Sequence, residues 1–152
     1  MQGGSGGGRL PRWIAAAAVV AGCAAIPDGS APYRVQGDAI RGSIAAAPGE
    51  AACGREVVLG RDSNCLLCHA VPDAGARAMG NIGPPLAGVG SRLDEGQLRL
   101  RIIDSMRLNP DTVMPSYYRT DGLSRVAGTW RGKTILTAQQ VEDAVAYLLT
   151  LR

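Results

Sequence analysis

An all-α fold is predicted by two apolar patterns and one short motif. Residues 137–149 and residues 94–106 place apolar side chains at intervals of three and four positions, which is the spacing of an α-helix with one buried face. Upstream of both patterns stands the sequence Cys65-Leu66-Leu67-Cys68-His69. Two cysteines separated by two residues and followed at once by a histidine are typical of the covalent attachment site of a c-type haem.

The chemistry of this motif explains why it needs these residues. The thiols of Cys65 and Cys68 would each bond one vinyl group of a single haem c, and His69, the one histidine among 152 residues, would bind the iron. A zinc site would need a second Cys/His pair, which Cys23 and Cys53 do not supply, and a thioredoxin-like site would need a βαβ pattern. The sequence therefore predicts a class I-like cytochrome c domain with one covalent haem c.

The N-terminus has the pattern of an export signal. In residues 1–22, two arginines precede an alanine-rich apolar run that is too short to cross a bilayer. The sequence Val20-Ala21-Gly22-Cys23 resembles a bacterial lipobox, in which Cys23 would carry lipid; ordinary cleavage after Ala25, with loss of Cys23, is the alternative. In either case we expect a periplasmic protein, bound to the membrane only through a lipid at Cys23.

The charge of the chain gives no argument for a nucleic-acid function. The formal net charge is +3, and removing the two arginines of the signal peptide leaves +1. No basic run interleaved with aromatic residues occurs, so neither nucleic acid nor an anionic membrane surface is predicted as a partner.

The expected domain occupies residues 48–152, and residues 23–47 precede it as a linker or N-terminal arm. The arm has no clear period, so a solvated tether is favoured. The domain opens with a helix from Glu50 to about Leu59. Cys53 lies on its apolar face without an obvious partner, and we expect a small buried side chain rather than a reactive thiol.

A loop rich in Gly and Pro, between Val71 and Ser91, follows the motif. An iron-bound imidazole needs an acceptor for its second ring N–H, and a backbone carbonyl in a rigid turn supplies one. In c-type cytochromes a G-P-x-L segment has this role, and Gly83-Pro84-Pro85-Leu86 resembles it. This resemblance makes the Pro84 carbonyl the expected acceptor for His69.

The next helix is predicted to start at Asp94, because Gln97 stands three positions later as in a capping box. Leu98, Ile102 and Met106 repeat every fourth residue and predict its buried face. The sequence Asn109-Pro110 should end it.

The last helix has the strongest local signals. Thr137 and Gln140 form a second capping box, and Leu136 with Val141 forms a hydrophobic staple. In cytochromes c the first and last helices cross. That resemblance would pack Tyr147 against the small residue Gly54.

The second axial ligand is predicted to be Met114. Met106 belongs to the apolar face of a helix, and Met79 lies in the loop assigned to the His69 side. Met114 lies far downstream in a loop and is followed by Pro115, which prevents a helix there. Filling the core is the alternative role for Met114. His/Met ligation raises the redox potential and favours electron transfer over chemistry at the iron.

Four parts of the sequence carry a family resemblance: residues 80–86, Arg99, residues 109–118 with M-P-S-Y-Y, and residues 132–143 with L-T-A-Q-Q-V-E-D. With these, roughly residues 33 to 152 resemble SoxX, the monohaem cytochrome c subunit of the SoxAX complex in bacterial sulfur oxidation. The resemblance implies the haem subunit of a heterodimeric L-cysteine S-thiosulfotransferase, which joins thiosulfate oxidatively to a cysteine of the carrier SoxYZ.

The same resemblance implies which subunit does what. The catalytic haem and its cysteine ligand belong to a SoxA-like partner, and a SoxX-like chain accepts electrons and passes them to an external cytochrome c. The positions that match the haem site are Cys65, Cys68, His69 and Met114. Cys53 matches no functional position, and the lipobox departs from a simply soluble SoxX.

Two other functions are compatible with the residues. A free periplasmic c-type electron carrier would use the same iron chemistry without any link to thiosulfate, and it would have a smaller, transient contact surface than a subunit has. A structural lipoprotein with an accidental C-x-x-C-H would lack haem absorption.

Overall fold

The computed structural model describes residues 1, 23, 31–72, 74, 75 and 77–152. Apart from Met1 and Cys23, the predicted signal peptide and lipobox lie outside these residues, as does the alternative cleavage point after Ala25. Export and processing of the chain therefore stay predictions.

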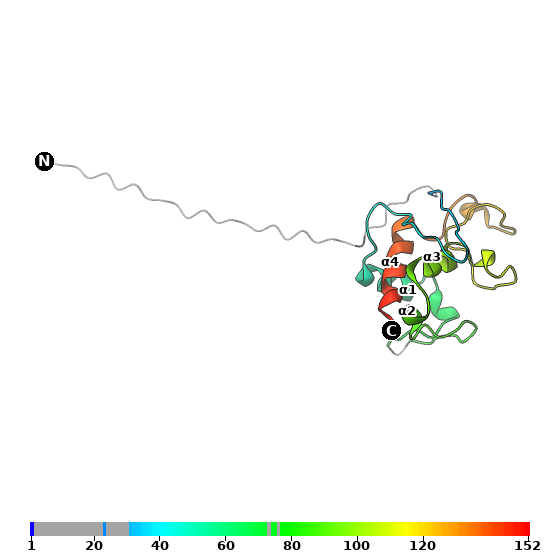
Figure 1. The fold of residues 1–152 in the computed structure, drawn as a ribbon, viewed down its shortest axis with the longest axis horizontal. Helices are drawn as coiled ribbons and strands as arrows, with labels where there is room; N and C mark the ends of the chain where they lie inside the picture. The colour runs from blue at the N-terminus through cyan, green and yellow to red at the C-terminus, as the bar shows by residue number, and fades with distance from the viewer. Residues whose placement is uncertain (2–22, 24–30, 73, 76) are drawn as a thin grey trace.

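The described residues form four α-helices and three short 3-10 helices, and they contain no β-strand. This confirms the predicted all-α class. In chain order the elements are α1 (Ala51–Leu59), η1 (Cys65–Leu67), α2 (Val89–Arg92), α3 (Glu95–Asp104), η2 (Ser105–Arg107), η3 (Gly128–Trp130) and α4 (Ala138–Thr150). Figure 1 shows α4 at the centre, with the other helices packed around it.

Helices α1 and α4 make the most extensive helix contact, and a glycine permits it. A methyl group added at Gly54 would overlap the backbone carbonyl of Asp143 and would lie 2.9 Å from the Cβ of Tyr147. Backbones can approach this closely only where one side chain is absent. The predicted packing of Tyr147 against Gly54 at a crossing of the first and last helices is therefore confirmed.

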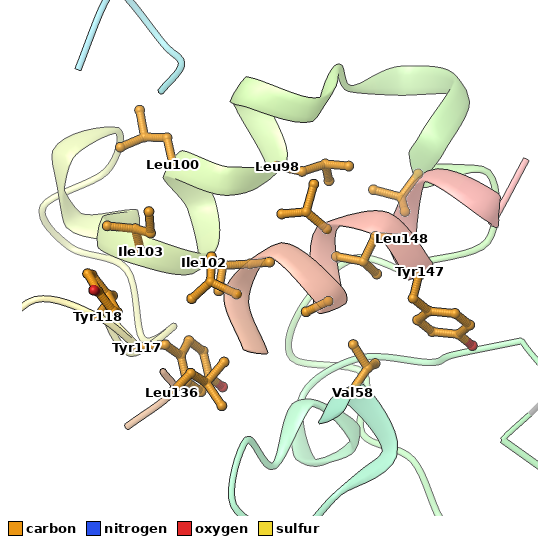
Figure 2. Packing of buried hydrophobic residues seen from close by; sticks show 14 of the residues in the cluster. Val58, Leu98, Leu100, Ile102, Ile103, Tyr117, Tyr118, Leu136, Tyr147 and Leu148 are labelled. Atoms are coloured by element: carbon orange, nitrogen blue, oxygen red, sulfur yellow. The ribbon is translucent and has the colours of Figure 1, made fainter. Parts of the chain in front are cut away.

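The core consists of aliphatic residues and three tyrosines, in a chain that has no Phe. Figure 2 shows Tyr117 and Leu136 packed together beneath Ile102 of α3, and Tyr147 on the opposite side beside Val58 of α1. The predicted staple residue Leu136 is 3% exposed. The apolar face of α4 is buried as its spacing predicted, with Leu149 half-buried at its edge.

Both capping boxes are present. Asp94 accepts a hydrogen bond from the backbone of Gln97, and Thr137 accepts one from the backbone of Gln140; each Gln side chain returns a bond to the capping residue. The expected start of the first helix is shifted by one residue, because Glu50 is the N-cap and α1 begins at Ala51.

The predicted end of α3 at residues 109–110 is wrong, since the α-helix ends at Asp104. The carbonyls of Ile102 and Ile103 accept hydrogen bonds from the backbone N–H groups of Tyr117 and Tyr118, at 3.0 and 3.3 Å. In a continuing α-helix these carbonyls would bond to residues 106 and 107. The returning chain uses them instead, so Met106 falls in a 3-10 turn and is half-buried rather than a core residue.

The N-terminal arm is part of the packed structure rather than a solvated tether. Ala39 and Ile40 are fully buried, and the N–H of Ile40 donates to the carbonyl of Gly96 at 3.0 Å. The tether prediction considered only local composition. The arm instead finds its partners on α3 and α4, which follow it by more than fifty residues in the sequence.

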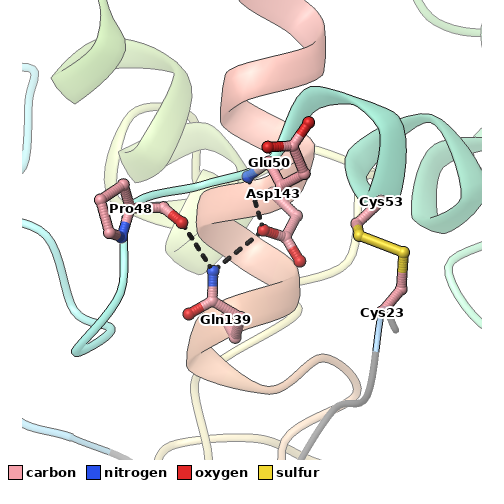
Figure 3. The surroundings of a disulfide bond; sticks show 6 residues. All are labelled: Cys23, Pro48, Glu50, Cys53, Gln139 and Asp143. Atoms are coloured by element: carbon pink, nitrogen blue, oxygen red, sulfur yellow. Dashed lines mark hydrogen bonds between the residues drawn. A yellow bond between two sulfur atoms is a disulfide. The ribbon is translucent and has the colours of Figure 1, made fainter. Parts of the chain in front are cut away.

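A buried ion pair holds this arm in place. Arg99 of α3 makes two bonds of 2.8 Å to the carboxylate of Glu142 on α4, and it donates to the Ile40 carbonyl at 2.7 Å. Glu142 also accepts from the N–H of Ile44 at 2.9 Å. The neighbouring acid is used similarly: Asp143 accepts from the N–H of Glu50 at the start of α1 (Figure 3).

The structure gives Cys53 a partner that the sequence did not predict. Cys23 and Cys53 are joined by a disulfide across 30 positions of sequence (Figure 3). A sulfur atom in a disulfide cannot also carry a lipid thioether, so this pairing and a lipid at Cys23 exclude each other, and cleavage after Ala25 would remove the pairing; lipidation and cleavage both stay predictions. Cys53 is half-buried on α1 and has a partner. The pairing is a tertiary contact that sequence spacing does not reveal.

Candidate haem-binding site

An apolar cavity of about 460 Å³ lies between α1, α3, α4 and the loops that join them. Cys65 and His69 lie on its wall together with Met114. Most of the other lining side chains are aliphatic and come from helices distant in sequence: Val57, Val58, Val89, Leu98, Ile102, Ala144 and Leu148. The volume is within the usual range for cofactor pockets, which are largely apolar with a few placed polar groups.

The attachment motif is wound into a tight turn directly after α1. Cys65–Leu67 forms η1, and the N–H groups of Cys68 and His69 both donate to the carbonyl of Cys65, at 3.2 and 3.0 Å. The preceding residue, Asn64, has a φ of 52°, in the left-handed region that Asn tolerates better than most residues. The sharp turn brings Cys65 and His69 to the same cavity.

The Gly/Pro-rich loop is tied to the motif by backbone hydrogen bonds. The N–H of Gly80 donates to Leu66 and that of Gly83 donates to Cys68, each at 2.8 Å. Gly83 lies against the imidazole, and a methyl group added there would overlap the ring of His69. The carbonyl of Pro84 is 2.7 Å from Nδ1 of His69, which is the hydrogen bond that the sequence led us to expect. It leaves Nε2 available for a metal ion.

A tyrosine that sequence analysis did not single out completes this wall. Tyr117 lines the cavity, is 6% exposed, and donates its hydroxyl to the carbonyl of Ser63 at 2.6 Å. Burial raises the pKa of Tyr117, so the ring stays neutral. Burial also raises the pKa of the Cys65 thiol. The only sequence signal for Tyr117 was its place in the M-P-S-Y-Y run.

The three methionines of the described domain differ in their surroundings. Met114 lines the cavity, whereas Met79 and Met106 do not. The sulfur of Met79 accepts the N–H of Val71 at 3.2 Å, on the loop beside His69. The backbone around Met114 is fixed on both sides, because its N–H donates to the Thr112 hydroxyl and its carbonyl accepts from the Ser105 hydroxyl.

These residues fit a haem. The apolar cavity could take the porphyrin, and the thiol of Cys65, the imidazole of His69 and the thioether of Met114 lie on its wall. The second thiol of the motif, Cys68, does not line the cavity but directly precedes His69 in the chain. This is a donor set that would hold a covalently attached haem. The hydrogen bond from His69 to Pro84 is the kind of outer contact that orients an iron-bound imidazole.

Comparisons with known proteins agree with this site. The cytochrome c family model matches residues 52–152. A chain in the crystal structure of SoxXA from P. pantotrophus is similar to this chain, with a TM-score of 0.71 and 33% sequence identity; the match covers 83% of this chain and 98% of that chain. A search of curated proteins finds no match.

Because the family model covers more than half of the sequence, this chain belongs to the cytochrome c family and carries covalent haem c. Its fold is the class I-like cytochrome c fold that the sequence predicted. Within the family it is a SoxX-like cytochrome, as the resemblance of residues 33–152 implied.

Proposed function

We propose that this chain is the electron-accepting haem subunit of an enzyme complex that joins thiosulfate to a protein cysteine. The observation that carries the proposal is the apolar cavity that has Cys65, His69 and Met114 on its wall. The similarity of this chain to almost the whole length of a SoxXA chain supports the same assignment.

In this proposal, Cys65 and Cys68 would hold the haem through thioether bonds, and His69 and Met114 would bind its iron. The haem, when bound, supplies a one-electron ferric/ferrous couple whose potential is raised by His/Met ligation. With His69 and Met114 both bound to the iron, the chain would leave substrate no place there.

The residues around the ligands hold their positions. The Pro84 carbonyl accepts the Nδ1 hydrogen of His69, which fixes the ring plane and strengthens Nε2 as a donor. Ser105 and Thr112 fix the backbone of Met114. A site held rigid from both sides changes little in geometry between oxidation states, and this favours electron transfer.

Three exposed apolar side chains adjoin these ligands and support a protein partner. Leu67 within the attachment motif is 66% exposed, Ile82 next to Gly83 is 69% exposed, and Val113 next to Met114 is 76% exposed. Exposed apolar residues next to a functional site are typical of interaction surfaces. We assign these three residues to contacts with an electron-transfer partner.

The proposed joining of thiosulfate to a cysteine involves the complex as a whole. A carrier cysteine loses its proton, its sulfur bonds to the terminal sulfur of thiosulfate, and two electrons leave. The SoxA-like cytochrome subunit is proposed to perform this step on the carrier SoxYZ. The present chain takes the electrons one at a time and delivers each to an external cytochrome c.

We also propose that the protein works in the periplasm. The Cys23–Cys53 disulfide supports this, because structural disulfides persist in oxidising compartments. No helix among the described residues has the length and hydropathy needed to cross a membrane. The signal-like pattern in residues 1–22 supplies the route of export.

The ligand assignment is tested by Met114→Ala. The variant should lose the weak sulfur-to-iron charge-transfer absorption of the ferric holo-protein, and its reduction potential should fall. Met79→Leu and Met106→Leu are matched controls, because neither side chain lines the cavity, and both should keep the band. If Met114→Ala kept the band, another side chain would be the ligand.

The thiosulfate assignment is tested with purified components. The holo-chain is mixed with the SoxA-like subunit, the SoxYZ carrier and thiosulfate, and haem reduction is followed by absorbance. Reduction should require all three additions. If a SoxA-like subunit neither binds this chain nor makes its reduction depend on thiosulfate, the chain is a free electron carrier instead.

A further inference from the structure

Residues 119–134, here called the basic loop, connect the cavity wall to the segment before α4 and present a second exposed surface. It contains η3 and no other helix or strand. Figure 1 shows it in pale orange, projecting from the upper right of the molecule, away from the C-terminus. None of its residues lines the haem cavity, and none of them is buried.

The two ends of the basic loop meet at one residue of the cavity wall. The carbonyl of Tyr117 accepts the N–H groups of Ile135 and Leu136, at 2.8 and 3.1 Å. The side chains of Tyr117 and Leu136 line the haem cavity. The loop thus leaves the cavity wall at Tyr117 and returns to it at Leu136, so it is an Ω-loop built directly on that wall.

The charge of this loop is unusual for the chain. Four cations, Arg119, Arg125, Arg131 and Lys133, accompany one acid, Asp121, which gives +3. The whole 152-residue chain also has a formal charge of +3, so all other residues together sum to zero. Among the described residues, no ion pair involves Arg125, Arg131 or Lys133, and all three are exposed.

The loop also presents a hollow with a mixed polar and apolar lining among these cations. A depression of about 290 Å³ is lined by Leu123, Val126 and Trp130 together with Arg125 and Arg131. Trp130 is 51% exposed and Leu123 is 38% exposed. Exposed Trp beside Arg is the composition that dominates binding energy in protein interfaces.

Backbone and side-chain hydrogen bonds brace the loop near both of its ends. Arg119 donates to the carbonyl of Asp121 at 2.7 Å and lies 3.4 Å from the buried carboxylate of Asp104. The N–H of Lys133 donates to the carbonyl of Trp130 at 3.1 Å, which closes the turn after η3. An ordered surface loses less conformational entropy when it binds than a flexible one does.

We infer that the basic loop is the docking site for an acidic segment of the SoxA-like subunit, with carboxylates at Arg125 and Arg131 and an apolar side chain against Trp130. This inference rests on the proposed function, since it names the face that meets the proposed partner. The cations accelerate encounter, Trp130 slows dissociation, and the anchorage at Tyr117 keeps the contact near the haem.

The test measures binding of the holo-chain to the purified SoxA-like subunit by surface plasmon resonance over a range of salt concentrations. Arg125→Glu with Arg131→Glu should lower the association rate constant at least tenfold at low ionic strength and weaken its salt dependence. Trp130→Ala should raise the dissociation rate constant at least tenfold. Unchanged haem absorption and unfolding midpoints verify that the variants fold.

A charge-matched control is Arg61→Glu with Arg152→Glu, which reverses two exposed arginines outside the loop. It should bind like the unaltered chain. If the loop variants also bind normally while the unaltered chain binds its partner, the docking site is elsewhere and the proposed function stands. If the unaltered chain does not bind, both proposals fail. If the loop variants instead lose binding to phosphatidylglycerol vesicles and not to the subunit, the loop is a membrane contact and the inference is overturned.

Discussion

The buried ion pair between α3 and α4 gives the sharpest prediction about stability. The side chains of Arg99 and Glu142 are 1% and 4% exposed, and they share two hydrogen bonds of 2.8 Å. Removing one member of a buried pair leaves the other charge without compensation, which costs about 3–5 kcal/mol. The substitution Glu142→Ala does this to Arg99.

The other contacts of Arg99 and Ile44 decide where in that range the loss of unfolding free energy should fall. Arg99 keeps an ion pair with Glu95, whose side chain is 61% exposed, so part of its charge stays compensated. Ile44 loses the acceptor for its N–H but is only half-buried and can bond to water. We therefore expect a loss near the lower limit, about 3 kcal/mol. This is a large part of the roughly 5–15 kcal/mol by which domains are stable.

The assay is urea unfolding of the ferric holo-protein, followed by far-ultraviolet circular dichroism. Covalent haem stays on the chain in both states, so its release does not complicate the transition. The midpoint should fall with little change in slope. Glu56→Ala, an exposed acid of α1, is the matched control and should change stability by no more than about 0.5 kcal/mol.

A double variant separates the ion pair from simple loss of packing. Arg99→Met with Glu142→Leu removes both charges and keeps the volume, so it should be more stable than Glu142→Ala alone. The reasoning is refuted if Glu142→Ala costs less than about 1 kcal/mol of stability. It is also refuted if the separate effects of Arg99→Met and Glu142→Leu on stability simply add up to the effect of the double variant.

Two further predictions concern the haem wall and the disulfide. Gly83→Ala should reduce the yield of holo-protein or disturb its ferric spectrum, because the new methyl group overlaps the ring of His69; Gly128→Ala, with open space around the position, should do neither. Non-reducing peptide mass analysis of the exported protein should find Cys23 linked to Cys53, and Cys23→Ser should lower stability by about 2–4 kcal/mol. A lipid mass on Cys23, or two free thiols, would refute the pairing.

The sequence by itself determined the features whose signals are local. Cys65, Cys68 and His69 lie within five positions, so the motif carries its chemistry in any fold that leaves it accessible. The caps Asp94 and Thr137 bond to residues three positions away, and the structure has both boxes where the sequence predicted them. Such contacts depend on the neighbouring residues alone.

Elimination among the methionines extended the prediction to Met114, which is 45 positions from His69 but shares its cavity. Spacing alone could not have brought the two together. The choice of Met114 over Met79 and Met106 depended on its loop and on Pro115, and the structure agrees in placing only Met114 of these three on the cavity wall.

Tertiary structure decided what depends on partners far along the chain. α3 ends at Asp104 because the backbone N–H groups of Tyr117 and Tyr118 donate to carbonyls in its last turn. No pattern within the helix records that contact. Arg99 is buried because Glu142 and the Ile40 carbonyl meet it from two other segments. A charged residue on a helix is otherwise expected to face water.

The cysteines show the same division between local and distant information. Cys65 and Cys68 are recognisable from their spacing, whereas Cys23 and Cys53 are 30 positions apart and have no motif in common. A pairing at that separation depends on the path of the chain between the two cysteines, which no local pattern records. Local sequence therefore indicated a lipid site at Cys23, and the folded chain uses the same sulfur as a covalent link to α1.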